Sequence, residues 1–112
     1  MDFAERAARN EEVFRSINER IDDGARQHDV EAPLPFHCEC SQLVCTDTIE
    51  LRPSEYDAVA ANPFRFVVKP GHQLTKVERV VADRGAYLVV KKVGEARAEI
   101  EREHPRRRHQ EP

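Results

Sequence analysis

The chain has 112 residues, which is enough for one domain with a modest hydrophobic core. Charged residues make up 35% of it and aromatic residues only 6%, with no tryptophan, so the core must rest mainly on aliphatic side chains. The formal net charge is −3, with acidic residues concentrated before position 53 and basic residues over positions 53–93, and this balance argues against a strongly basic nucleic-acid-binding protein.

The opening segment, MDFAERAARNEE, is charged and has no apolar core of the kind found in signal peptides. Further along, no apolar run approaches the roughly 20 residues that a transmembrane helix needs. We therefore expect a cytoplasmic protein with no membrane contact. In that compartment thiols stay reduced, so clustered cysteines indicate metal ligands or redox groups rather than disulfides.

Residues 1–29 are predicted to be an N-terminal unit formed by one long amphipathic helix, from residue 3 to about residue 27. Its apolar residues recur at spacings of three, four and seven: Phe3, Ala7, Phe14, Ile17, Ile21 and Ala25. Asn10 interrupts this stripe at a core-like position, where a polar side chain can set the register of packing. We expect the stripe to pack on the protein's own sheet or, alternatively, to bind a protein partner or a second copy through Phe14, Ile17 and Ile21.

Residues 30–93 are predicted to form an α+β domain that contains a zinc knuckle, one small antiparallel sheet and one short helix. Pro33 and Pro35 favour an extended linker at its start. The alternation in TIEL indicates a strand at 48–51. A short helix is expected within RPSEYDAVAANP, because Pro53 suits the first helical position and the final Asn-Pro pair stops a helix.

Two further β-rich segments follow in the chain. FRFVVKPGH at 64–72 is expected to be a strand that ends at its Pro-Gly pair, and residues 76–93 are expected to form a hairpin that turns at residues 83–85. The segment 94–112 is polar and contains two prolines. We expect one or two helical turns at its start and a disordered tail after them.

All three cysteines of the chain lie in FHCECSQLVC, as a C-x-C pair, Cys38 and Cys40, followed by Cys45. A disulfide between Cys38 and Cys40 would close a small, strained ring, and one between Cys40 and Cys45 would leave an odd thiol. Three thiolates that converge from one turn are better suited to a metal, because these soft donors bind zinc, copper(I) and iron–sulfur clusters.

A structural zinc site takes four ligands, and the five histidines of the chain are the candidates for the fourth. His28 ends the long helix, two others lie in the tail, and His37 adjoins Cys38, so that it points the other way in extended chain. His72 follows a Pro-Gly turn directly after a strand, and such a turn can present an imidazole to a knuckle elsewhere. We therefore predict a structural zinc site of the Cys3His type, made of Cys38, Cys40, Cys45 and His72.

Redox alternatives remain open at this site. The same four residues could hold a [2Fe–2S] cluster, and the C-x-C start resembles that of the CDGSH-type iron–sulfur proteins, although no Cys-Asp-Gly-x-His segment follows here. The cysteines could also take part in thiol redox chemistry, or simply be buried as small apolar residues.

An enzyme is the less favoured interpretation, because the chain has no glycine-rich phosphate loop and no nucleophile elbow. Two catalytic arrangements are conceivable: a Cys45–His72 nucleophile pair, or a catalytic zinc with Glu39 as general base. We expect Glu39 instead to face solvent, as the middle residue of an alternating C-x-C strand.

Five segments carry a resemblance to other proteins: FRSINERI, FHCECSQLVC, the EY of RPSEYDAV, NPFRFVVKPGH and the final LVVKK. In these segments, which span residues 14 to about 92, the chain resembles a group of small actinobacterial proteins of uncharacterised activity. The resemblance implies a shared fold and a shared metal knuckle with the pattern C-x-C-x4-C…P-G-H, and it implies no activity.

Together these patterns predict a small zinc-binding protein that acts as a non-catalytic regulatory or interaction module. The helix would contact a protein partner. Arg65 and Lys69 belong to a basic stretch that suits an acidic protein or a nucleic-acid backbone, so a nucleic-acid-associated zinc protein is kept as an alternative. The run PRRRH at 105–109 follows EIEREH, which largely cancels its charge, so a solvated tail is expected there.

Overall fold

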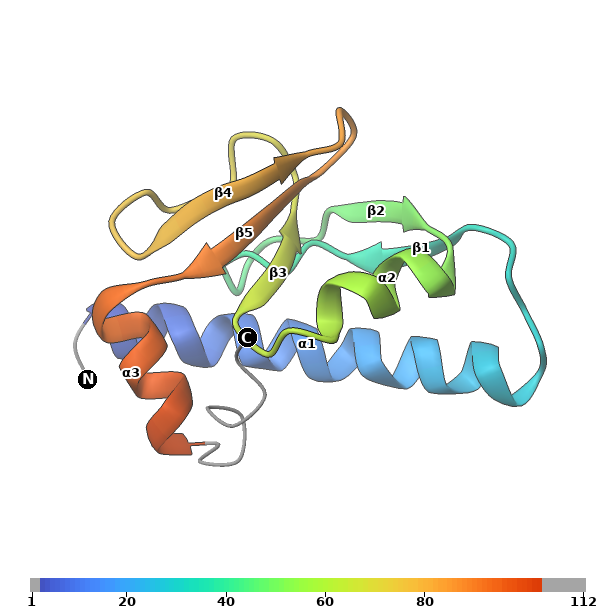
Figure 1. Ribbon diagram of the computed structural model, residues 1–112, viewed down its shortest axis with the longest axis horizontal. Helices are drawn as coiled ribbons and strands as arrows, with labels where there is room; N and C mark the ends of the chain where they lie inside the picture. The colour runs from blue at the N-terminus through green and yellow to red at the C-terminus, as the bar shows by residue number, and fades with distance from the viewer. Residues whose placement is uncertain (1–2, 104–112) are drawn as a thin grey trace.

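The computed structural model describes residues 3–103 and has the predicted α+β fold (Figure 1). Helix α1 (Phe3–Gln27) is followed by strands β1 (Leu34–His37) and β2 (Thr48–Leu51), helix α2 (Pro53–Ala60), strands β3 (Arg65–Val68), β4 (Glu78–Asp83) and β5 (Leu88–Lys92), and helix α3 (Gly94–Glu103). In Figure 1, α1 runs along one side of the molecule, both sheets lie on the same side of it, and α3 lies near its N-terminal end.

The strands form two small antiparallel sheets rather than the single sheet that we expected. One is the hairpin of β1 and β2, and the other has the strand order β3-β5-β4. Strand β1 occupies part of the segment in which Pro33 and Pro35 suggested a linker, because a two-stranded sheet leaves each strand a free edge where proline is tolerated. A backbone hydrogen bond of 2.7 Å, from Glu39 N to Val67 O, connects the cysteine loop to the larger sheet.

The C-terminal segment is helical over a longer stretch than the sequence predicted. Helix α3 runs for 10 residues and packs against α1, and the side chain of Ile100 is fully buried. Arg97 lies over the ring of Phe64, 4.3 Å from its centroid, which adds a cation–π contact. One large apolar residue among charged ones is a weak sequence signal, so this helix depends on tertiary contacts. The remainder of the expected tail, residues 104–112, lies outside the described residues.

Helix α1 is amphipathic as predicted, but its buried face differs from the predicted apolar stripe. Phe14 is 5% exposed, whereas Phe3 and Ile17 are 45% and 42% exposed. The buried residues of α1 include four polar or charged ones: Glu11, Arg15, Asn18 and Asp22. Buried polar groups need partners, and here other elements supply most of them, which the sequence of the helix alone cannot reveal.

A buried ionic cluster ties α1 to the three-stranded sheet. The ammonium group of Lys92 contacts the carboxyl groups of Glu11 and Glu78, and each of the three residues is at most 2% exposed. Burial raises the pKa of Glu11 well above its usual range. Burial opposes the ionisation of Glu78 too, but its hydrogen bond with Glu11 and the charge of Lys92 lower its pKa. Glu11 therefore takes up a proton more readily than an exposed glutamate does, and a protonated Glu11 would make this cluster of one ammonium and two carboxyl groups neutral.

We expect Glu11→Gln to change how the free energy of unfolding depends on pH. The pKa of Glu11 is higher in the folded state than in the unfolded chain, so the folded protein keeps a proton that the unfolded chain releases. Stability therefore falls as pH rises between these two pKa values, with a limiting slope of about 1.4 kcal/mol per pH unit. Glutamine does not titrate, so the variant should lack this decline.

Urea denaturation of both proteins from about pH 6 to about pH 9 measures the difference, because ordinary carboxylates stay ionised over that range. If the stability of the two proteins changes with pH in the same way, the raised pKa of Glu11 is contradicted.

Candidate metal centre

The three cysteines lie in the loop that connects β1 to β2. A hydrogen bond of 2.9 Å from Cys38 N to Asp47 O continues the hairpin beyond its strands. A second bond of 2.9 Å, from Cys45 N to Gln42 O, closes a turn within the loop. These two bonds fold the loop back on itself, which brings Cys45 close to the C-x-C pair.

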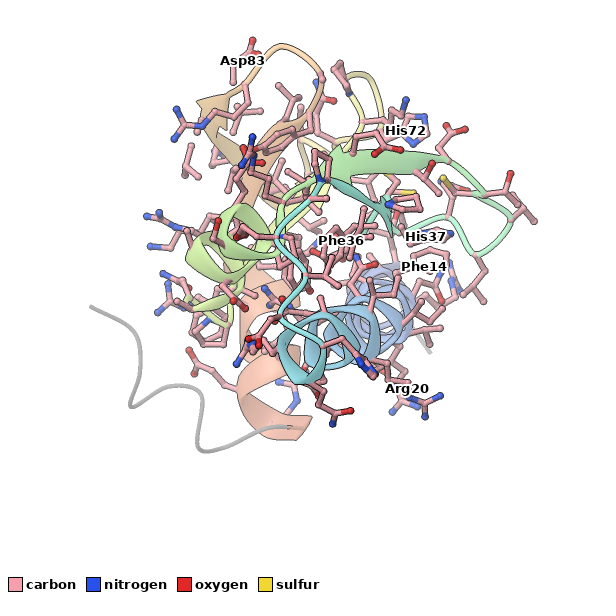
Figure 2. All side chains as sticks on the ribbon, turned by 90° about the vertical axis from the view of Figure 1, so that its right-hand side faces the viewer. Phe14, Arg20, Phe36, His37, His72 and Asp83 are labelled. Atoms are coloured by element: carbon pink, nitrogen blue, oxygen red, sulfur yellow. The ribbon has the colours of Figure 1, made fainter. Side chains whose placement is uncertain are left out.

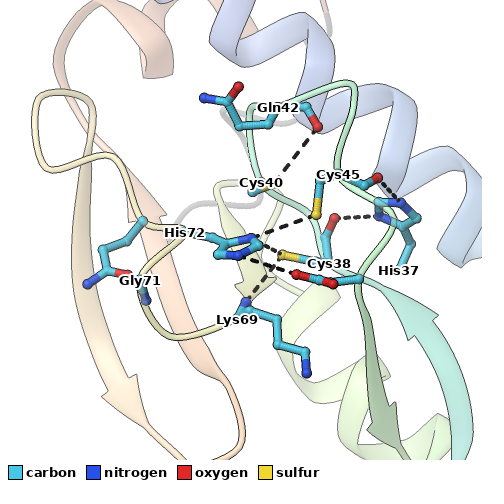
Figure 3. A network of polar contacts seen from close by, with 10 residues as sticks. His37, Cys38, Cys40, Gln42, Cys45, Lys69, Gly71 and His72 are labelled. Atoms are coloured by element: carbon cyan, nitrogen blue, oxygen red, sulfur yellow. Dashed lines mark hydrogen bonds and ion pairs between the residues drawn. The ribbon is translucent and has the colours of Figure 1, made fainter.

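His72 approaches the cysteines from the turn that follows β3. Gly71 has a φ of +94°, in the left-handed region that favours glycine, and His72 N donates to Lys69 O at 3.0 Å. The chain reverses here, and the imidazole ring points at the thiols (Figure 3). The Pro-Gly turn thus presents His72 to the cysteine loop, as the sequence predicted.

Four side chains form one cluster in which a potential ligand atom of each lies within 4.8 Å of the others: Cys38, Cys40, Cys45 and His72. The Nδ1 atom of His72 is 3.5 Å from Cys38 Sγ and 3.7 Å from Cys45 Sγ. Around a tetrahedral zinc ion, bonds of about 2.3 Å to sulfur and about 2.0 Å to nitrogen place these two atoms about 3.5 Å apart. The cluster is therefore compatible with a single four-coordinate metal ion.

Two further contacts orient these potential ligands. The backbone amide of Lys69 donates to Cys38 Sγ at 3.2 Å. On the other side of the imidazole ring, His72 Nε2 lies 3.4 Å from Asp47 Oδ2. A carboxylate beside one ring nitrogen favours the tautomer in which the other nitrogen can bind a metal. Asp47 thus leaves Nδ1 of His72 directed at the thiols.

His37 lies beside the cluster and is not part of it. Its Nδ1 and Nε2 atoms are 2.5 Å from Cys38 O and 2.9 Å from Cys45 O, so the ring bridges two parts of the loop. The ring also stacks on Phe14 of α1, with 3.9 Å between the centroids (Figure 2). Asn10, at the position predicted to set the register of α1, donates to a carbonyl oxygen of the same loop at 2.6 Å. Helix α1 therefore supports the cysteine loop at two points.

The three thiols differ in how readily they lose a proton. Interaction with the Cys38 thiol lowers the pKa of Cys40 to about 5. The same interaction, with burial, raises the pKa of Cys38 above its usual range, and burial raises the pKa of Cys45. Cys40 is therefore the first thiolate of the cluster, and a metal ion that binds here would displace the protons of the other two.

Glu39, between the first two cysteines, is fully buried, so the expectation that it faces solvent is wrong. Its Oε2 atom accepts hydrogen bonds from the Tyr56 hydroxyl at 2.6 Å and from Asn18 Nδ2 at 3.0 Å. Its Oε1 atom accepts one from Val67 N at 3.0 Å. The middle side chain of an extended C-x-C segment does point away from the thiols, but here it meets Asn18 of α1 and Tyr56 of α2 instead of water.

Asn18 and Tyr56 were missed as site residues by the sequence analysis. Asn18 also exchanges two hydrogen bonds with the backbone of His37, from Nδ2 to His37 O at 2.8 Å and from His37 N to Oδ1 at 2.7 Å. One sequence signal was available for Asn18. It recurs at helical spacings of four and three with the other polar residues of the buried face: Glu11, Arg15 and Asp22.

The outer edge of the cluster borders a surface cavity of about 430 Å³. Cys45, Asp47 and His72 belong to the wall of this cavity, whereas Cys38 and Cys40 are fully buried. Solvent therefore reaches the cluster from the side of Cys45 and His72.

The five residues predicted to contact a partner differ in their exposure. Phe14 is buried against His37, Ile21 is half-buried against the core, and Ile17 is exposed. Arg65 on β3 and Lys69 just after it are both half-buried. Of the three apolar candidates on α1, Ile17 is thus the one whose side chain is open to a partner.

No family model, curated protein or solved structure matches the chain. Within residues 3–103, the helices lack the combination of length and apolar character needed to cross a membrane. The structure itself therefore defines the class, which is an α+β protein with a Cys3His cluster.

We expect Glu39→Ala to lower the free energy of unfolding by about 3–5 kcal/mol, because it leaves the buried donors of Tyr56, Asn18 and Val67 without an acceptor. Glu50→Ala is the matched control. It removes an exposed glutamate from β2 and should change stability by less than about 0.5 kcal/mol. Chemical denaturation measures both values. Equally small losses in the two variants would contradict the buried network.

Proposed function

We propose that this chain is a small zinc-binding protein with a structural zinc ion held by Cys38, Cys40, Cys45 and His72. The observation that supports this proposal most strongly is the convergence of four donor atoms from two loops, although Cys45 and His72 are 27 positions apart in the sequence. Three thiolates and an imidazole form a donor set that zinc takes in structural sites.

The compactness of the cluster supports one metal ion rather than a [2Fe–2S] cluster. In a [2Fe–2S] cluster two protein ligands bind each iron, so ligand atoms on opposite irons lie farther apart than ligand atoms around one ion. All four donor atoms here lie within 4.8 Å of one another. A single tetrahedral zinc ion requires separations of about 3.5–3.8 Å, which this arrangement reaches with small adjustments.

The surroundings of the cluster support a structural rather than a catalytic ion. Structural zinc sites have four protein ligands, whereas catalytic sites keep one position for water. Four protein donors are present, and two of them, Cys38 and Cys40, are fully buried. Glu39, the residue considered as a general base, points away from the thiols and is hydrogen-bonded to Tyr56 and Asn18.

A metal ion at this position would have a large effect on stability. Structural zinc in finger peptides binds with about 10–16 kcal/mol, which is comparable with the whole stability of a typical domain, about 5–15 kcal/mol. The ion would cross-link the loop between β1 and β2 to the turn after β3. The folding of both segments should therefore depend on the metal.

We further propose that the zinc-stabilised fold is a non-catalytic interaction module, in the cytoplasm, for a protein partner or a second copy of the chain. Exposed apolar side chains support this proposal. Val13 and Ile17 on α1 are 48% and 42% exposed, and Leu43 and Val44 in the cysteine loop are 57% and 87% exposed. A protein partner would cover these exposed apolar side chains, as happens in the buried centre of a protein–protein interface.

The full chain, purified without chelator or affinity metal, is expected to contain about one zinc ion per molecule and to be colourless. His72→Ala and Cys45→Ser should each lose most of the zinc, because three protein donors leave the tetrahedral site incomplete. Chelation should lower the melting temperature, since the free energy of metal binding contributes to folding. Elemental analysis, absorption spectroscopy and thermal denaturation measure these quantities.

His28→Ala is the matched control, because this exposed histidine follows α1 and should not affect the zinc content. Visible absorption without zinc would favour the iron–sulfur alternative, and protein without any metal would leave three reduced thiols. A melting temperature that chelation does not change would contradict the structural role even if zinc is bound.

Ile17→Asp is expected to abolish self-association through α1 and to leave the protein folded, because the Ile17 side chain is 42% exposed. Phe14→Asp should unfold the protein instead, because it places a charge in the contact with His37. Sedimentation over a range of concentrations should show a wild-type dimer and a monomeric Ile17→Asp variant. A wild-type chain that stays monomeric throughout would contradict self-association and leave a different protein as the partner.

A further inference from the structure

A second polar site lies between α1 and α2, which run alongside each other in Figure 1. Here a cavity of about 560 Å³ has Tyr56 in its wall, the same residue whose hydroxyl group donates to Glu39. The cavity wall contains more acidic than basic side chains. The carboxylates are those of Glu19, Asp22, Asp23 and Asp57, and the guanidinium groups are those of Arg15 and Arg26. The lining is therefore acidic, and it favours a cation as ligand.

Asp22 provides the observation that points to a ligand. The residue is only 3% exposed, and its Oδ2 atom accepts a hydrogen bond from Arg26. Its Oδ1 atom is buried and has no hydrogen-bond partner in the part of the chain that the structure describes. A buried carboxylate oxygen without a donor is costly, and Asp22 is part of the cavity wall. A ligand in the cavity would therefore satisfy this acceptor once the Asp22 side chain turns toward it.

The two arginines of the cavity leave this acceptor unused. Arg15 donates from Nη1 to Pro63 O at 2.9 Å and from Nη2 to Arg65 O at 2.5 Å, so its fork is directed at backbone carbonyls. Arg26 has a side chain that is 61% exposed, and one nitrogen, Nη2, serves both Asp22 Oδ2 and Asp57 Oδ1 at 2.5 Å. Asp22 and Asp57 therefore share a single donor atom, Nη2 of Arg26, and Asp22 Oδ1 receives no hydrogen bond from it.

The burial of Asp22 and its closeness to Asp57 add to the attraction of the cavity for a cation. Burial and the neighbouring Asp57 raise the pKa of Asp22 to about 6. A second positive charge at the cavity would stabilise the ionised form of Asp22, so that no proton would be needed there.

We propose that this cavity binds a guanidinium group. A guanidinium group is planar and always charged, and it carries several donors in a fixed fork that matches carboxylate oxygens. The group would donate to Asp22 Oδ1 and to the exposed carboxylates at the mouth of the cavity. Its source is either an arginine side chain of a protein partner or a free small guanidine compound, and both present the same chemistry.

The test is a titration of the ¹⁵N-labelled full chain, followed by amide shifts in heteronuclear NMR spectra. The probes are agmatine, as a free guanidine compound, and a short acetylated peptide with one arginine. The same peptide with citrulline in place of arginine is the neutral control of equal shape. We expect saturable shifts from residues of α1 and α2 that line the cavity, caused by at least one of the charged probes and not by the citrulline peptide.

Two variants test whether the probes bind at the carboxylates of the cavity. Asp22→Asn and Asp57→Asn should each weaken binding at least about tenfold, because each removes a charge-assisted acceptor. Glu50→Gln is the matched control, since it removes one exposed negative charge from β2 and should leave binding unchanged. The dispersion of the amide signals shows whether each variant is folded. If Asp22→Asn unfolds the chain, the binding measured with Asp57→Asn alone tests the role of the carboxylates.

The outcomes separate the possibilities. Binding of the peptide but not of agmatine would assign the site to an arginine of a partner, and equal binding of both would assign it to free guanidine compounds as well. The proposal is overturned if neither charged probe gives saturable shifts, if citrulline binds as well as arginine, or if inorganic phosphate perturbs the cavity instead. It is also overturned if both folded Asp variants bind like the wild type.

Discussion

The buried carboxylate of Glu39 is the constraint on which the arrangement of this protein depends. It accepts hydrogen bonds from Asn18 on α1, Tyr56 on α2 and the amide of Val67 on β3, so one side chain joins three separate elements. Because neighbouring side chains of an extended chain alternate in direction, an inward Glu39 turns both flanking thiols to the opposite side, where the histidine meets them. The orientation of the Cys3His cluster is therefore set by the hydrogen bonds of the core.

Polar contacts of this kind recur along α1. They supplement the limited apolar packing of a chain in which only 6% of the residues are aromatic. Arg15 donates to two backbone carbonyls and lies 4.3 Å from the centroid of the Phe66 ring, and Glu11 shares a buried cluster with Lys92 and Glu78. Each contact requires a partner at one position, so together they admit one placement of the helix on the sheets. The same packing of α1 against α2 leaves the acidic cavity at its edge.

Local patterns were sufficient for elements whose geometry depends on sequence neighbours. Helix α1, strand β2 and the β4–β5 hairpin lie within the predicted ranges, and Pro53 begins α2. His72 could be predicted because a Pro-Gly turn after a strand limits where its ring can point. The burial of Glu39, the polar inner face of α1 and the length of α3 could not be predicted, because each depends on groups that distant elements supply. A polar residue has the same local signal whether water or a buried tyrosine is its partner.

The measurement that tests the central claim most directly is X-ray absorption at the zinc edge of the purified full chain. Four protein ligands of the Cys3His type require three sulfur neighbours at about 2.3 Å and one nitrogen neighbour at about 2.0 Å, with the outer-shell scattering of one imidazole. That result would establish that both loops hold a single ion. A first shell of four sulfurs, a shell dominated by oxygen, or a shell without imidazole scattering would contradict the proposed ligand set and with it the role of His72.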